Sequence, residues 1–325
     1  MHPAFSVIFL TTLIGVGQGL FLALFTGQVD SLAKLLPAQS GAFYSLGSFV
    51  ALGFLAAGLI ASIFHLGRPG RAWRAVSQWR TSWLSREVIV LPLFMLLVLC
   101  YGIVHGMDWT DPLFTLAGTL PVDMSLIIGV LGTLAAFGLF LCTAMIYASL
   151  RFLQEWHTPL TVANYTFLGI ASGFTLAAAL SAWQGTHLVG FYGLWAVVAT
   201  LLGMVTRVAS LVRNARLKHK SSLQTAIGVR HTTMAQKAQG FMGGSFNTRE
   251  FFHGRSEGTL KTLRAGFILL LFVVPPMLIL LAWALESKVL PMVAFVVQYL
   301  GLLMERYYFF ADARHPQNLY YQSAA

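Results

Sequence analysis

Eight long apolar runs constrain this 325-residue sequence more than any other feature. Runs of about 18 or more apolar residues are typical of transmembrane helices. A bilayer offers the backbone no hydrogen-bond partners, so only helices and closed barrels cross it, and no strand-like alternation competes here. We therefore predict an all-α, polytopic membrane protein, a bundle of eight transmembrane helices that forms a single integral membrane domain over residues 1–325. The runs cover about 5–26, 42–64, 88–106, 124–150, 161–182, 188–208, 264–284 and 289–310.

The composition agrees with a membrane protein. Charged residues make up 10% of the sequence, whereas a soluble domain carries about 25%. The first run lacks the basic start and the small-residue cleavage site of a signal peptide, so we expect it to remain as a span. These features exclude a soluble globular enzyme.

The basic residues are unevenly placed along the sequence. Of the 21 Lys and Arg residues, 17 lie within residues 66–86, within 207–264 or at Arg151, while 106–123 holds three Asp and no basic residue. Basic loops next to membrane spans stay in the cytoplasm. We therefore expect both termini and a polar loop at about 213–263 to be cytoplasmic. The basic excess could also reflect membrane topology alone, without any binding role. It is not a nucleic-acid signature.

Metal centres find little support in the sequence. The two cysteines lie inside apolar runs and form no C-x-x-C pair, so neither an iron–sulfur cluster nor c-type haem is indicated. Haem b needs two histidines on facing helices at one depth. The candidates lie at span ends or in turns, a poor setting for axial ligands: His65, His105, His157 and His187. We expect no haem and no iron–sulfur cluster on this chain.

Ionisable residues within a membrane are costly and often functional. The central parts of the eight runs contain none, which argues against a proton-coupled transporter. Such residues gather at the predicted cytoplasmic span ends instead, where His65 and Glu87 could face one another. A quinone site needs a hydrogen-bond donor, a proton route and an apolar slot. His65 and Glu87 suit the first two roles, and Trp73 suits the slot.

Each of these residues also has a structural interpretation. An interfacial His is often structural. Glu87 could serve simply to cap a helix N-terminus, and the Trp residues could simply form an interfacial belt. The conjunction of all of them favours a quinone site.

Four stretches resemble the membrane anchor subunit of dimethyl sulfoxide reductase and its relatives, the complex iron–sulfur molybdoenzymes. They are "FHLGRPGRAWRAVSQWRTSWLSRE", "CTAMIYASLRFLQEWHTPLTVANY", "FNTREFFHGRS" and "ERYYFFADARHPQNLYY". The resemblance covers essentially the whole sequence. The opening "HPAFSVIFLTTLIGVGQGLFLAL" is more similar to a branch that anchors cytoplasmic sulfite dehydrogenase.

The resemblance implies a complex in the bacterial inner membrane. A molybdopterin catalytic subunit and a ferredoxin-like subunit with [4Fe-4S] clusters would sit on this multi-pass anchor. The anchor would exchange electrons with ubiquinone or menaquinone, during sulfite oxidation or dimethyl sulfoxide reduction. The family's quinone-site residues correspond to His65 and Glu87, to which we add Arg71 and Arg74 for their charge and position.

The polar loop and the C-terminal tail lie on the predicted cytoplasmic side. We therefore expect them to dock the iron–sulfur subunit, through Arg249, Phe251, Phe252, Arg255 and Arg314. The alternative function is a membrane transporter for a small anion or sulfur compound, which predicts uptake by this protein alone.

Overall fold

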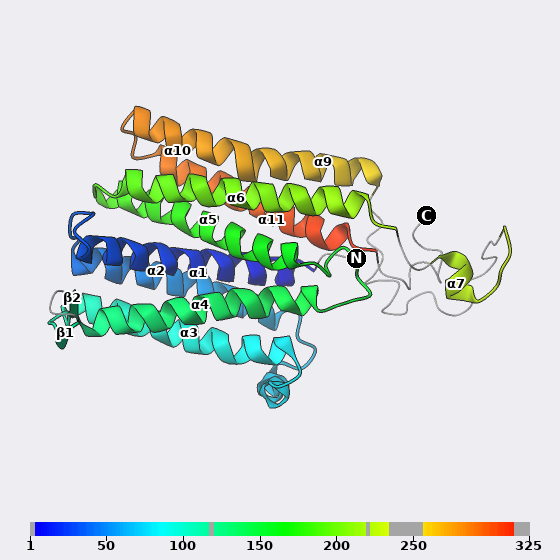
Figure 1. Cartoon of the computed structure of the whole chain (residues 1–325), viewed down its shortest axis with the longest axis horizontal. Helices are drawn as coiled ribbons and strands as arrows, with labels where there is room; N and C mark the ends of the chain where they lie inside the picture. The colour runs from blue at the N-terminus through cyan, green and yellow to red at the C-terminus, as the bar shows by residue number, and fades with distance from the viewer. Residues whose placement is uncertain (1–3, 117–119, 219–221, 234–255, 315–325) are drawn as a thin grey trace.

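The computed structural model describes residues 4–116, 120–218, 222–233 and 256–314, and its long helices lie side by side along one axis (Figure 1). Seven helices in this part of the protein are long and apolar enough to cross a membrane, the seventh being the continuous run Glu257–Ala284. The helices are α1 (Phe5–Leu32), α2 (Gly41–Ile63), α3 (Trp83–Gly106), α4 (Met124–Ala148), α5 (Pro159–Gln184), α6 (Val189–Ala215), α7 (Leu223–Ile227), α9 (Glu257–Phe267), α10 (Val274–Ala284) and α11 (Leu290–Ala311).

The helix α11 differs from these seven in composition. It is 22 residues long and packs against α5 and α10, but its buried face carries Gln298, Glu305 and Arg306. The all-helical fold is confirmed, with seven candidate spans where eight were predicted. A membrane crossing by α11 stays a prediction.

The helices α1 and α5 form the centre of the bundle, because most of each lies against other helices. Their contact depends on glycine. A side chain at Gly173 would collide with the backbone of Gly19, and one at Gly19 with the backbone of Gly169. Small residues allow this close approach in membranes, where dispersion contacts hold helices together.

Side-chain caps decide where several helices begin. The hydroxyl of Ser82 accepts a hydrogen bond from the Ser85 backbone N–H, and the Asp123 carboxylate accepts one from Leu126. Such caps satisfy N–H groups that a helix start leaves unpaired. As a result α3 begins at Trp83, five residues before its apolar run, and Glu87 lies inside the helix.

Two short irregular elements were not predicted. The strands β1 (Phe114–Leu116) and β2 (Leu120–Val122) form an antiparallel hairpin between α3 and α4. Three residues are too few to show an alternating pattern. The π-helical segment η3 (Ile268–Val273) joins α9 to α10 just before Pro275 and Pro276. Proline cannot donate the usual helical hydrogen bond, and a π-helical turn accommodates that loss.

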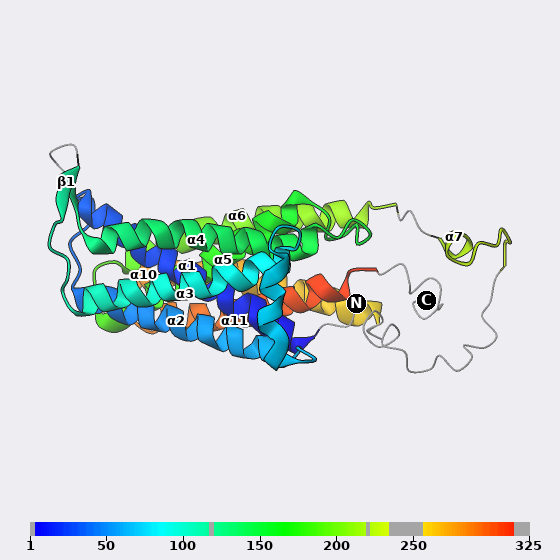
Figure 2. The same cartoon turned by 90° about the horizontal axis from the view of Figure 1, so that it is seen from below.

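The two ends of the bundle differ. At the N-terminal end lie the start of α1, the end of α11, the connections α2–α3 and α4–α5, the end of α6 and the start of α9 (Figure 1). The opposite, hairpin end carries β1 and β2. Between α2 and α3, the 3₁₀ helix η1 (Pro69–Gln78) runs across the bundle, end-on in Figure 1 and upright in Figure 2. In the described part of the protein, the basic connections therefore begin and end at one end of the bundle, as predicted.

Candidate quinone site and buried ion cluster

The predicted site residues around His65 lie at the N-terminal end of the bundle. Helix α2 ends at Ile63, and His65 follows it with an exposed side chain whose pKa is lowered by partial burial. Arg71, Trp73 and Arg74 lie on η1, and the Arg74 guanidinium stands 5.5 Å from the Trp73 ring. Because Trp73 is 70% exposed, it belongs to the surface of this protein and does not form a closed slot within it.

Glu87, unlike His65, is shielded from the surface. It is buried in α3, and its Oε1 accepts a 2.5 Å hydrogen bond from the Thr143 hydroxyl of α4. No hydrogen bond or ion pair joins Glu87 to His65, both of which the structure describes. The two residues share one end of the bundle, and His65 meets the surface while Glu87 lies beneath it. A proton passing between them would need an intermediate group, such as a water molecule.

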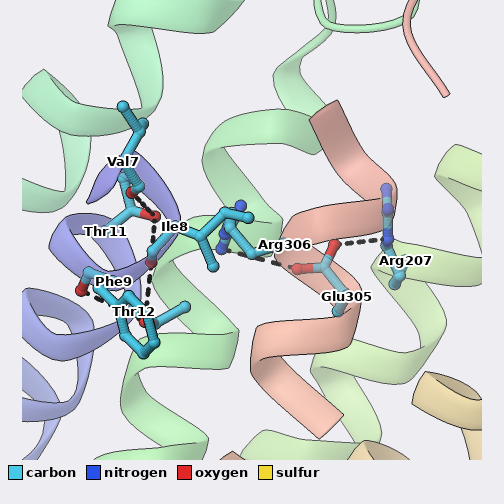
Figure 3. A network of polar contacts seen from close by, with 8 residues as sticks. All are labelled: Val7, Ile8, Phe9, Thr11, Thr12, Arg207, Glu305 and Arg306. Carbon is cyan, nitrogen blue, oxygen red and sulfur yellow. Dashed lines mark hydrogen bonds and ion pairs between the residues drawn. The ribbon is translucent and has the colours of Figure 1, made fainter. Parts of the chain in front are cut away.

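A cluster of three ionised side chains is buried between α6 and α11. Arg207 Nε of α6 lies 2.8 Å from Glu305 Oε1, and Arg306 Nη2 lies 3.8 Å from Glu305 Oε2. Figure 3 shows Glu305 between the two arginines, with residues of α1 beyond Arg306. Each of the three is at most 3% exposed. We call these residues the ion cluster.

Aromatic rings enclose the ion cluster. The Arg306 guanidinium carbon lies 3.7 Å from the centre of the Tyr165 ring, and that of Arg207 lies 5.6 Å from Phe267. Cations are attracted to aromatic faces, more strongly where water is excluded. The rings therefore stabilise the two cations, which exceed the single carboxylate by one charge.

Sequence reasoning missed this cluster. It predicted that the sixth span ends at residue 208 and counted Arg207 with the basic segment that follows. In the structure α6 continues to Ala215, so Arg207 lies within the helix. That expectation is corrected: the charges continue along a helix instead of opening a loop. The adjacent pair Glu305–Arg306 inside an apolar run was the available signal.

The connection between α4 and α5 is tied to its neighbours. Arg213 Nη1 of α6 donates to the Gln154 carbonyl at 3.0 Å, and Trp156 Nε1 donates to the Phe309 carbonyl at 3.0 Å. The backbone N–H of Arg314, a predicted docking residue, donates to Glu155 Oε1, while its side chain is exposed. The connection between α4 and α5 is therefore held against α6 and α11, with Arg314 exposed beside it. We call residues 154–156 and Arg314 the platform.

The four remaining predicted docking residues lie outside the described residues; they are Arg249, Phe251, Phe252 and Arg255. In the described part of the protein, no three His, Cys, Asp or Glu side chains group as metal ligands would. Cys100 and Cys142 are free thiols on α3 and α4.

A second polar group lies at the hairpin end. The Tyr101 hydroxyl donates to Gln28 Oε1, Gln28 donates to the Ser125 hydroxyl, and Ser125 donates to Asp123 Oδ1. The His105 ring packs at 4.5 Å from the Tyr101 ring. These bonds link α1, α3 and α4 far from the predicted quinone residues.

Apolar helices of spanning length, joined by basic connections at one end, define a multi-pass membrane protein. The chain belongs to the family of DMSO reductase anchor subunits, whose model matches residues 1–312. It is thus a membrane anchor of the molybdoenzyme type, in the bacterial cytoplasmic membrane.

Two proteins similar to this chain are subunits of named enzyme complexes. The chain is 64% identical to a sulfite dehydrogenase subunit from Allochromatium vinosum over 325 residues, which cover all of both proteins. It is 26% identical to a subunit of the anaerobic dimethyl sulfoxide reductase from Haemophilus influenzae over 178 residues, covering 51% of this chain and 60% of that protein.

Proposed function

We propose that this chain is the quinone-reactive anchor of a sulfite-oxidising molybdenum complex. The observation that supports this most is the whole-length likeness to a subunit of sulfite dehydrogenase, because the more distant relative matches only half of the sequence. The anchor itself is non-catalytic toward sulfite. A molybdopterin subunit oxidises sulfite, and a ferredoxin-like subunit with [4Fe-4S] clusters passes the electrons to ubiquinone or menaquinone at the anchor.

The proposed topology has eight crossings, α11 included, with the N-terminal end in the cytoplasm. The basic connections at that end support this orientation. The partner subunits then dock on the cytoplasmic side, on the platform that presents Arg314 and on the segment with Arg249, Phe251, Phe252 and Arg255.

The residues at this end fit a quinone. The exposed His65 imidazole offers a hydrogen-bond donor to a carbonyl oxygen, and Arg71 and Arg74 offer positive charge nearby. Quinone reduction consumes two electrons and two protons. In the proposed proton route Glu87, which is buried and hydrogen-bonded to Thr143, holds a proton on its way to the site. Protons taken from the same side as the electrons make the step electroneutral.

The test is electron transfer in the purified three-subunit complex. Sulfite with a short-tail quinone, and dimethyl sulfoxide with the corresponding quinol, are offered to the wild type and to His65→Ala. We expect sulfite:quinone activity in the wild type and its loss in the variant, with dye-linked sulfite oxidation retained. His187→Ala, an exposed histidine at the hairpin end, is the matched control. Equal quinone activity in all three proteins would contradict the proposed site.

A further inference from the structure

A groove of about 350 Å³ lies between α1 and α2 at the N-terminal end of the bundle. Along α2 its lining recurs at positions 57, 60, 61 and 64, and along α1 at 6, 9 and 13. This is the spacing of one face of a helix. The groove therefore follows the two helix axes, over a length of roughly 10 Å at 1.5 Å per residue.

Residue sizes explain why the helices leave a groove here. On the packed side Gly58 lies so close to α1 that a side chain there would press on Ile14. On the groove side, Ala57 and Ala61 present only methyl groups between the larger Ile60 and Phe64. The glycine brings the helices together and the alanines leave a hollow beside that contact.

The lining is suited to a hydrocarbon ligand. Six of the seven lining residues are apolar, and Ser6 supplies the remaining hydroxyl. The outer rim is open, because Phe64 is 81% exposed and Ile60 is 56% exposed. A ligand can therefore enter sideways from the lipid phase. The volume is at the low end for ligand sites, about 300–1,000 Å³, and suits part of a long molecule.

The groove ends next to the candidate quinone site. Phe64 lines it, and His65 is the next residue in the sequence. We propose that this groove seats the first isoprenoid units of the quinone whose ring is bound at His65. The inference rests on the proposed function. It predicts that the quinone enters between α1 and α2, and that quinones with long isoprenoid tails are the preferred substrates.

A phospholipid acyl tail is the competing occupant. The negatively charged phosphate of such a lipid would be attracted to the arginines of η1. The tail of a quinone gains no hydrophobic free energy on leaving lipid, so its preference for the groove comes from packing contacts. A variant that fills the groove should therefore act through KM for tailed quinones, and not through the chemistry at the ring.

The experiment compares Ala61→Phe with the wild type in the purified three-subunit complex. KM and kcat are measured for a quinone with two isoprenoid units and for the same ring without a tail. We expect KM for the tailed quinone to rise at least about fivefold, with KM for the tail-less quinone and kcat for both nearly unchanged. The matched control is Leu59→Phe, which enlarges a lipid-facing residue of α2 that does not line the groove.

The outcomes separate this inference from the proposed function. If Ala61→Phe leaves KM for the tailed quinone unchanged while His65→Ala abolishes quinone activity, the groove proposal is overturned and the proposed function stands. If His65→Ala is fully active, the proposed function itself fails. If Ala61→Phe raises KM equally for the tailed and the tail-less quinone, the groove does not hold the quinone tail and the proposal is overturned.

A second measurement does not depend on how the variant folds. A quinone carrying a photoreactive azide on its first isoprenoid unit is activated in the wild-type complex, with tail-less quinone as competitor. We expect label on peptides within 5–13 or 57–64. Label confined to other helices would overturn the proposal.

Discussion

Arg207 and Glu305 form an ion pair with only 2.8 Å between Nε and Oε1, and it is almost wholly shielded from solvent. It joins α6 to α11, the helix whose membrane crossing is least evident from composition. Breaking a buried pair by removing one partner leaves an uncompensated charge, which costs about 3–5 kcal/mol. Removing Arg207 or Glu305 alone is therefore expected to loosen the packing of α11 in the bundle.

This relationship predicts the effect of neutralising Glu305. Glu305→Gln should lower the thermal unfolding midpoint of the detergent-solubilised complex and reduce its yield from membranes, because two buried arginines lose their counter-charge. The double variant Arg207→Met/Glu305→Leu should recover part of the loss.

The matched control is Glu257→Gln. Glu257 pairs with Lys261 at 3.9 Å on the surface, and exposed pairs contribute about 0–1 kcal/mol. Equal destabilisation by Glu305→Gln and Glu257→Gln would contradict a special role for the buried cluster.

The glycine contact between α1 and α5 predicts a second sensitive position. Gly173→Leu should prevent stable folding or cost several kcal/mol, because the new side chain would meet the backbone of Gly19, which cannot rotate away. Gly53→Leu serves as control, since the space beside Gly53 is open. The amount of monodisperse protein recovered in detergent decides between them, and a well-folded Gly173→Leu protein would refute the close contact.

The pKa of His65 predicts a pH dependence of quinone reduction. Partial burial lowers that pKa below its ordinary value of 6.5, so the imidazole is neutral at pH 7 and gains a proton only as the pH falls further. Quinone reduction consumes protons and the imidazolium is the better donor. The ratio of quinone-linked to dye-linked rates should therefore rise below pH 6.5. His65→Gln should abolish the rise, and its persistence there would assign it to another group.

Glu87 and Thr143 supply a prediction about the proton route. Glu87→Gln should slow quinone-linked turnover and change its pH profile, because the amide keeps the shape but carries no proton. Thr143→Val should produce a milder effect of the same kind by removing the hydrogen bond to Glu87. Thr133→Val makes the same chemical change on α4 at a hydroxyl without a partner in the described structure. An unchanged pH profile in Glu87→Gln would remove Glu87 from the route.

The polar segment before α9 predicts where the partners dock. Deletion of residues 241–255 should release the hydrophilic subunits into the soluble fraction, because it removes Arg249, Phe251, Phe252 and Arg255 together. Membrane fractionation with antibodies against the partner subunits gives the answer. Full retention of both subunits on the membrane would place docking elsewhere, for example on the platform that presents Arg314.

Much of the fold followed from the sequence alone. Lipid leaves the backbone no hydrogen-bond partners, so long apolar runs had to become helices, and the placement of arginines predicted which connections share one end. The nearby capping residues Ser82 and Asp123 then determine where α3 and α4 begin. These features are local, and composition and spacing are enough to read them.

Only the tertiary structure decided which helices meet. The ion pair of Arg207 with Glu305 joins residues far apart in the sequence, and Glu87 contacts Thr143 instead of His65. The groove beside Ala61 exists because α1 and α2 approach at Gly58 while two alanines of α2 present only methyl groups beside that contact. Such contacts depend on the rotation and depth of each helix in the bundle. In uniformly apolar helices the hydrophobic pattern does not specify these, because every face is compatible with lipid.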